Sequence, residues 1–207
     1  MSRPNAEEFR QVLLSRSPEA VAKEYIFSGE VYAFKGLPDA PWLLTQHLCR
    51  TLDLGALDFT VVGSGRTGFS LDPDKFPAEF SETSDIDVLV VNHTLFDAVW
   101  NNIVEWSYRV GGAMRSERDN QWLGARRREL HKGYFEPNNL RNPGVSGADS
   151  LAELRDFSTR WFDAFQSLSW HPEFAARRVS GRLYRTWDFA MLYQADNLRR
   201  IAEQLRK

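Results

Sequence analysis

Two aspartates separated by one residue stand at the start of an apolar run, Asp85-Ile86-Asp87-Val88-Leu89-Val90-Val91. The β-branched content of the run predicts a buried strand. Because side chains alternate across a strand, Asp85 and Asp87 should lie on one face and Ile86 on the other. Two ionised carboxylates this close repel each other, and a divalent cation removes that cost. The pair is therefore predicted to be both catalytic and metal-binding.

A second polar group follows an earlier apolar run, in Val61-Val62-Gly63-Ser64-Gly65. Glycines at a strand end permit a tight turn and a close approach of the backbone to a ligand. Exposed backbone N–H groups and the Ser64 hydroxyl can then hold phosphate oxygens. Arg66 can add a bidentate donor to phosphate, although a surface loop arginine is an equally good interpretation. A phosphate cradle beside paired carboxylates is what phosphoryl or nucleotidyl transfer requires.

The sequence here resembles the DNA polymerase β-like nucleotidyltransferase superfamily, and within it the small bacterial branches that include toxin-like and phage-defence enzymes. The resemblance rests on Gly63-Ser64 at one strand end and Ser84-Asp85-Ile86-Asp87-Val88-Leu89-Val90 on the next strand, and it covers about residues 58–107. It implies that Gly63, Ser64 and Gly65, with Ser84 in the second motif, contact a nucleoside triphosphate. It also implies that Asp85 and Asp87 bind Mg²⁺, with Mn²⁺ as an alternative.

The chain departs from that family in two ways. A long segment, residues 65–83, separates the motifs, and a lid over the nucleotide would explain it. The family also has a third carboxylate on a later strand, whereas the best later strand, Val179-Ser180-Gly181-Arg182-Leu183-Tyr184, has none. Candidates for the third carboxylate, chosen because they lie near expected strand ends, are Glu129, Glu136 and Asp188.

Composition narrows the class of protein. The chain has 207 residues and a net charge of −2, so it lacks the overall positive charge of a dedicated nucleic-acid binder. Its single cysteine, Cys49, cannot form an internal disulfide, which fits a reducing compartment. The first eight residues have no apolar segment typical of a signal peptide, and no apolar run approaches the length of a membrane span. We therefore expect a cytoplasmic protein without a membrane partner.

Hydrophobic periodicity predicts an α/β (α+β) fold, in which helices flank a small mixed sheet with nucleotidyltransferase-like topology. Capping boxes are expected at Thr94 and Ser150, and residues 65–84 are expected to be a loop. The expected helices are 5–14, 17 to about 27, 42–54, one from Thr94, one from Ser150, and 188–205; the expected strands are 59–62, 85–91 and one within 178–187.

These elements predict one nucleotidyltransferase-like domain over residues 1–207. It comprises N-terminal helices in 1–55, a motif-bearing core in 56–110, and C-terminal helices and a strand in 148–207. The expected function is Mg²⁺-dependent transfer of a nucleoside monophosphate from an NTP to a hydroxyl of RNA, protein or another nucleotide, in phage defence or a toxin system. The alternative is a catalytically inactive module on the same fold that binds a nucleotide or a protein partner, such as one from the same operon.

Overall fold

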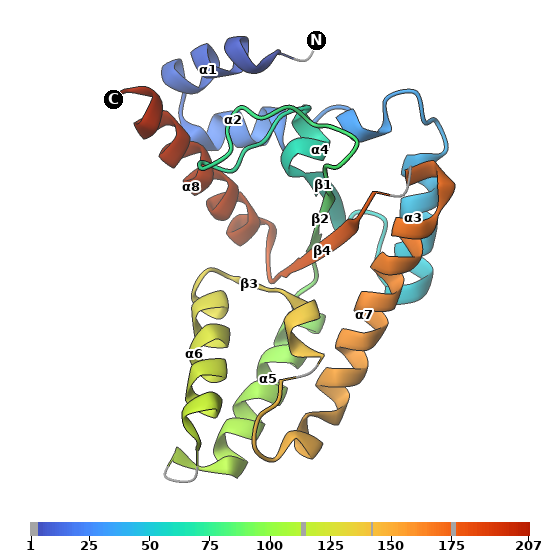
Figure 1. Cartoon of the computed structure of the whole chain (residues 1–207), viewed down its shortest axis with the longest axis vertical. Helices are drawn as coiled ribbons and strands as arrows, with labels where there is room; N and C mark the ends of the chain where they lie inside the picture. Colours follow the sequence, from blue (N-terminus) through green and yellow to red (C-terminus); the bar gives the residue numbers. More distant parts are fainter. Residues whose placement is uncertain (1–3, 113–114, 142, 175–176) are drawn as a thin grey trace.

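The computed structural model describes residues 4–112, 115–141, 143–174 and 177–207. In this part of the chain, eight α-helices surround a four-stranded mixed sheet, as Figure 1 shows. The expected mixed α/β class is therefore confirmed. Residues 1–3 of the N-terminal segment considered above lie outside the described residues.

The helices and strands follow the chain in a simple order. The helices are α1 (Ala6–Ser15), α2 (Pro18–Tyr25), α3 (Ala40–Leu52), α4 (Gly63–Thr67), α5 (His93–Val110), α6 (Glu117–His131), α7 (Ala152–Trp170) and α8 (Trp187–Leu205). The strands are β1 (Phe59–Val62), β2 (Ile86–Val91), β3 (Tyr134–Phe135) and β4 (Val179–Tyr184). Short 3₁₀ turns are η1 (Tyr32–Phe34), η3 (Pro137–Leu140), η4 (Ala148–Leu151) and η5 (Pro172–Phe174).

The sheet has the strand order β1-β2-β4-β3. β1 runs antiparallel to β2, β2 runs parallel to β4, and β3 runs antiparallel to β4. The motif-bearing β2 is thus an inner strand, and its register pairs Asp87 with Val62 on one side and with Ser180 on the other. Residues far apart in sequence are brought together by this pairing.

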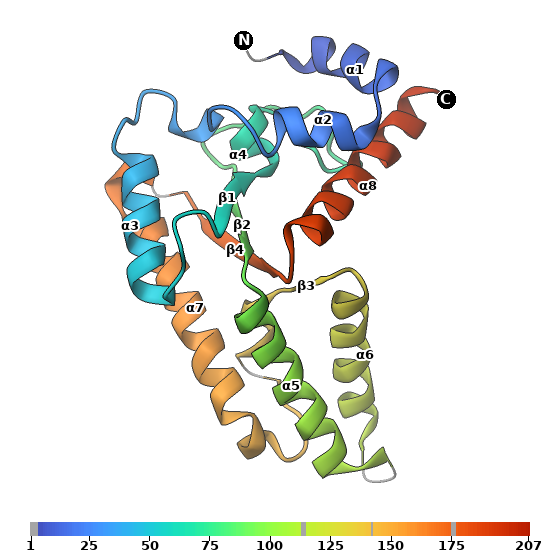
Figure 2. The same cartoon turned by 180° about the vertical axis from the view of Figure 1, so that it is seen from behind.

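The two faces of the sheet carry different cores. Ile86, Val88 and Leu183 point into a large core shared with α3, α5 and α7. Leu89, Val91 and Tyr184 point to the other face, where α1, α2 and α8 cover the far half of the strands. Figure 2 shows α8 and α7 on different sides of the sheet. The near half of the second face, which begins at Asp87, is not covered by a helix.

Several expected boundaries are correct and others are not. Asn5 caps α1 in a capping box, and Ser17 caps α2 with Pro18 in its first turn. The capping boxes expected at Thr94 and Ser150 are wrong. Asn92 caps α5 two residues earlier, because its side chain accepts from the backbone N–H of Leu95 at 3.0 Å. The Ser150 hydroxyl instead donates to the carbonyl of Gly147 within η4.

The segment after Gly63 is more ordered than expected. Its first five residues form α4, so residues 65–67 are helical and not loop. The two ends of the remaining loop are hydrogen-bonded to each other. Phe69 and Glu79 form an isolated antiparallel β-bridge, and Phe80 donates its backbone N–H to the carbonyl of Gly68. Phe69 packs edge-on against both Phe9 of α1 and Phe76, and Phe76 packs against Phe9 with a tilted ring. The N-terminal helix therefore anchors the loop that connects the two motifs.

Candidate functional site

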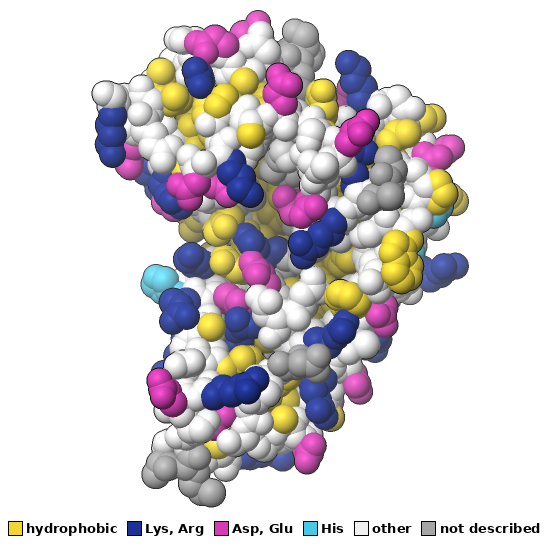
Figure 3. All heavy atoms as spheres, in the orientation of Figure 1, with side chains coloured by type: hydrophobic (Ala, Val, Ile, Leu, Met, Phe, Trp, Pro, Cys, Tyr) yellow, Lys and Arg dark blue, Asp and Glu magenta, His cyan; other side chains and the backbone are white. Residues whose placement is uncertain are grey.

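The uncovered half of the sheet forms the floor of a cavity of about 820 Å³. Its walls are the turn after β1, the loop of residues 70–79, the end of β4, η3 and one side of α8. Figure 3 shows the same face hollowed near its middle, with acidic and basic side chains around the hollow. We call this cavity the cleft.

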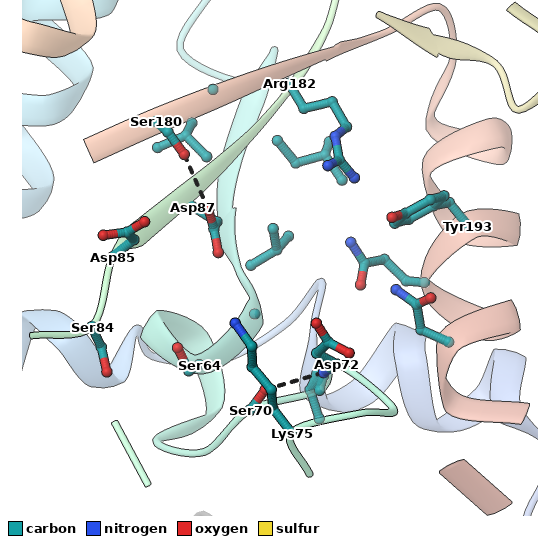
Figure 4. A pocket seen from close by; sticks show the side chains of 18 of the residues that line it. Ser64, Ser70, Asp72, Lys75, Ser84, Asp85, Asp87, Ser180, Arg182 and Tyr193 are labelled. Carbon is teal, nitrogen blue, oxygen red and sulfur yellow. Dashed lines mark hydrogen bonds between the residues drawn. The ribbon is translucent and has the colours of Figure 1, made fainter. Parts of the chain in front are cut away.

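The structure brings most of the predicted site residues into the cleft. Gly63, Ser64, Ser84, Asp85 and Asp87 all line it. Figure 4 shows Asp85 and Asp87 on β2 and its approach, with Ser64 on the opposite turn. Ile86 points away into the core, as side-chain alternation predicts. Side-chain alternation therefore placed Asp85 and Asp87 correctly on one side of the sheet, and the structure brings Gly63, Ser64 and Ser84 to the same cavity.

Gly63 is where the backbone of one motif meets the carboxylate of the other. Its φ is +63°, in the left-handed region that favours glycine, and a Cβ there would lie 3.2 Å from Oδ2 of Asp87. Val62, the residue before it, pairs with Asp87 across the two strands. A side chain at position 63 would therefore crowd the carboxylate, and glycine leaves that space open.

Asp87 is held in an environment that disfavours its charge. Its solvent-accessible carboxylate lies on the cleft floor, where desolvation by the surrounding walls raises the pKa. Repulsion from Asp85 raises the pKa further, whereas the Ser180 hydroxyl, which donates to Oδ1 at 3.1 Å, lowers it. Desolvation outweighs the hydrogen bond. A cation at this position would offset the repulsion between the carboxylates of Asp85 and Asp87.

Asp85 has a looser environment. It lies just before β2, is about half exposed, and faces Arg178 with 3.7 Å between Oδ2 and Nη1. Both side chains reach solvent, so this ion pair is weak. Asp85 can therefore turn toward a ligand in the cleft at little cost.

Arg66 is not a cleft residue, and its expected phosphate role is a misassignment. Its side chain is 5% exposed and lies on the other side of α4. Its guanidinium donates to the carbonyls of Ile26 and Gly29 and to the hydroxyl of Thr60. These bonds tie α2 and the following turn to β1. Gly65 also packs against Val61 and is absent from the cleft wall.

None of the three candidates for a third carboxylate joins Asp85 and Asp87. Glu136 lines the cleft but binds Arg182, with 2.6 Å between Oε1 and Nη2. Glu129 is paired with Arg126 on α6 at 2.8 Å, and Asp188 lies in the first turn of α8 outside the cleft wall. Across residues 4–112, 115–141, 143–174 and 177–207, no three His, Cys, Asp or Glu side chains cluster as a metal site would require. Ser180 occupies the position beside Asp87 on the neighbouring strand.

The cleft also holds residues outside the two motifs, and of these Arg182 and Tyr193 escaped prediction from the sequence. Lys75 extends from the loop into the cavity, and Arg182 and Tyr193 face it from β4 and α8 (Figure 4). The guanidinium of Arg182 lies over the Tyr134 ring at 4.5 Å and the Tyr193 ring at 5.1 Å. The sequence shows only that β4 and α8 carry polar residues. It does not show that those residues face Asp87, because the pairing of β4 with β2 joins segments far apart in the chain.

The charge of the cleft is mixed, with six acidic and four basic side chains among its described lining residues. A bare polyanion would meet repulsion from the acidic side chains, and a divalent cation bound to the polyanion would reduce it. No helix in the described part of the chain is long and apolar enough to cross a membrane. Comparison of the chain with protein-family models, curated proteins and solved structures found no match.

Proposed function

We propose that the cleft binds a nucleoside triphosphate together with a divalent cation and transfers its nucleotidyl group to a hydroxyl. One observation carries the proposal: the Gly63-Ser64 turn and the Asp85/Asp87 pair meet across adjacent strands at the floor of a single cavity. A phosphate-holding turn and paired carboxylates are the two components that such a transfer needs. The order of both motifs along the chain agrees with the resemblance to nucleotidyltransferases.

The donor set fits a cation that arrives with its nucleotide. Mg²⁺ typically takes one or two carboxylates and fills its other positions with phosphate oxygens and water. Asp85 and Asp87 would provide the protein's share, and the raised pKa of Asp87 gives a reason for a cation to be favoured there. Such a cation supplies neutralisation of the charge on the phosphates. Two carboxylates without a third partner make a poor site for a resident metal.

The chain's own residues position the substrate. Ser64 and the backbone after Gly63 hold phosphate oxygens, and Lys75 reaches into the same end of the cleft to balance their charge. Ser180 fixes the orientation of Asp87 through its hydrogen bond to Oδ1. In the transfer, the acceptor oxygen bonds to the α-phosphorus, the bond from that phosphorus to the α–β bridging oxygen breaks, and pyrophosphate leaves. The proton of the acceptor hydroxyl passes to solvent or to a cleft carboxylate.

A second candidate is favoured by the residue beside Asp87. With Ser180 there and Glu136 engaged by Arg182, the cleft holds fewer free carboxylates than a transfer site in the resembled family. A module that binds a nucleotide without turning it over would need only the cleft as it stands. The nucleotide site is common to both candidates, and only turnover distinguishes them.

Incubation with each α-labelled NTP and Mg²⁺ or Mn²⁺ tests the proposal, with RNA, protein and free nucleotides as acceptors. We expect label transfer and pyrophosphate release by the native chain and a loss of at least about 100-fold in Asp85→Asn and Asp87→Asn. Asp163→Asn, an exposed residue of α7 outside the cleft, is the matched control. Binding without transfer would favour the module, and transfer that survives both aspartate changes would refute the proposed site.

A further inference from the structure

One side of α8 forms a wall of the cleft, opposite the phosphate-holding turn. Tyr193, Gln194, Asn197 and Arg200 all line the cavity and are spaced so that they share one helical face. On the other side of the helix, Leu198 and Ile201 are fully buried in the core with α1 and α2. The helix thus presents a polar stripe to the cleft, and the stripe is rich in side-chain amides.

Gln194 is the most buried residue of this stripe. It is only 6% exposed, and its amide makes no hydrogen bond to any other described residue. The amide atoms are not among the buried polar atoms that lack a partner, so they reach the solvent of the cleft. A ligand in the cleft can therefore replace that solvent as donor and acceptor to a side chain that packing already holds in place.

The neighbouring wall consists of a guanidinium packed against two aromatic rings, and its charge is already paired. Arg182 lies against the rings of Tyr134 and Tyr193, and Glu136 binds its guanidinium at 2.6 Å. The amide of Asn139 in turn donates to the second oxygen of Glu136 at 3.0 Å. A guanidinium held in this way is poorly placed to bind phosphate. Guanidinium planes and aromatic rings are, however, surfaces on which nucleobases stack.

The two ends of the cleft therefore differ in chemistry. The end at Gly63-Ser64 has a hydroxyl, backbone N–H groups and the free ammonium of Lys75. The end at α8 has two amides, a tyrosine hydroxyl, the exposed guanidinium of Arg200, and the wall of Arg182 and its tyrosines. Both belong to one cavity of about 820 Å³, which lies within the usual range of small-molecule sites. A nucleotide has the same asymmetry, with phosphates at one end and a base at the other.

We propose that the α8 stripe is the nucleobase subsite of the cleft and that it selects adenine over guanine. A glutamine or asparagine amide offers one donor and one acceptor, which match N7 and the amino group of adenine in a bidentate pair. The corresponding edge of guanine carries two acceptors, which one amide cannot satisfy. This inference rests on the proposed function, because it takes the phosphates to lie at Gly63-Ser64.

Calorimetric titration of the full chain tests the subsite. The ligands are the α,β-methylene analogues of ATP, GTP, CTP and UTP, and inorganic triphosphate, each with Mg²⁺. The variants are Gln194→Met, which keeps the side-chain length, and Asn197→Ala, at a more exposed position where folding is less at risk. Gln204→Met is the matched control, because Gln204 is an exposed glutamine of the same helix outside the cleft.

We expect the ATP analogue to bind about 10-fold or more tightly than the GTP analogue, and Gln194→Met to remove about 10-fold of that preference. Asn197→Ala should weaken the ATP analogue in the same direction, whereas Gln204→Met and the affinity for triphosphate should not change. Binding of triphosphate and of all four analogues with equal strength would overturn the subsite and leave the proposed function standing. Failure of every ligand to bind, with native circular dichroism, would overturn both.

Discussion

Asp87 lies in an environment that disfavours its charge, although its side chain reaches solvent. Desolvation by the cleft walls and repulsion from Asp85 raise its pKa, and the Ser180 hydroxyl compensates in part. Perturbed pKa values of this kind are common among carboxylates that bind a ligand or take part in a reaction. Asp87 is therefore the residue at which a functional site and a merely structural one would behave differently.

Replacing Asp87 by Asn should stabilise the ligand-free chain at pH 7. Its pKa is raised above 3.8, so its contribution to stability is present below that pH and is lost as the pH rises through the folded-state value. Asn has no charge to desolvate and should give a slightly higher melting temperature at pH 7, with a smaller difference near pH 3.5. Asp163→Asn is the control, and a variant less stable than the native chain at pH 7 would contradict this interpretation.

Glu129 provides a pH-dependent stability effect remote from the two aspartates. Its carboxylate is 12% exposed, and desolvation raises its pKa to about 7 although Arg126 opposes the shift. Its stabilising contribution is present below pH 4.5 and is lost as the pH rises through 7. We expect Glu129→Gln to raise the free energy of unfolding by about 2 kcal/mol at pH 8 and to change it little at pH 5.

Urea unfolding at both pH values measures that effect, with Glu203→Gln on the exposed face of α8 as the control. An equal loss of stability at pH 5 and pH 8 would show that the ion pair with Arg126 outweighs the burial of Glu129.

Prediction of individual residues from the sequence succeeded where local spacing decides position. Alternation along β2 placed Asp85, Asp87 and Ile86 correctly. It failed for Arg66, because three acceptors from α2, the turn after it and β1 draw that side chain away from the cleft. It also missed Gln194, since the polar stripe of a helix looks solvent-facing until the sheet opposite it is known.

At the scale of elements, β4 must approach α7 unusually closely to pair with β2. A Cβ on Gly181 would lie 2.2 Å from Cζ of Phe165 and 2.9 Å from the indole of Trp161, and both rings are buried. We expect Gly181→Ala to cost about 1–3 kcal/mol of unfolding free energy and to displace the flanking Ser180 and Arg182. The free energy of unfolding measured in denaturant and the affinity for nucleotide should therefore both be lower in this variant.

Gly112→Ala provides the comparison for that change, because no atom of the described residues lies within 4 Å of its Cβ position. Equal stability of the two glycine variants would show that α7 can move away from β4 without cost.

The loop between the motifs depends on α1 for its order. Phe9 is fully buried and contacts both Phe69 and Phe76 of the loop. We expect Phe9→Ala to cost about 3–5 kcal/mol and to speed amide hydrogen exchange in residues 69–78 more than elsewhere. Leu14→Ala, a partly exposed position on the same helix, is the control. Unchanged exchange in the loop would mean that α1 does not hold it.

Most elements were predictable because hydrophobic periodicity and capping residues are local signals. β1, β2, β4 and α8 lie where their apolar patterns indicate, to within a few residues. α6 was missed because its exposed surface is almost wholly polar, with a weak apolar stripe limited to Leu123 and its neighbours. The two-residue β3 is too short for any pattern and exists only through its pairing with β4.

At the scale of the whole molecule, the cleft exists because the helices cover one face of the sheet fully and the other face only in part. α3, α5 and α7 close the first face, whereas α8 and the loop of residues 70–79 border the open half of the second (Figures 1 and 2). The site is therefore assembled from the two motif segments, β4, η3 and α8. Only its motif-bearing half could be predicted from the sequence.

The central claim is that Asp85 and Asp87 share a divalent cation with the phosphates of a bound nucleotide. Mn²⁺ binding measured by electron paramagnetic resonance, with and without the α,β-methylene ATP analogue, tests it most directly. We predict that the chain alone binds Mn²⁺ weakly. The chain and the analogue together should bind Mn²⁺ at least about 10-fold more tightly than either does alone. Asp87→Asn should abolish this gain in affinity. Mn²⁺ binding that is unaffected by the nucleotide, or unchanged in Asp87→Asn, would contradict the claim.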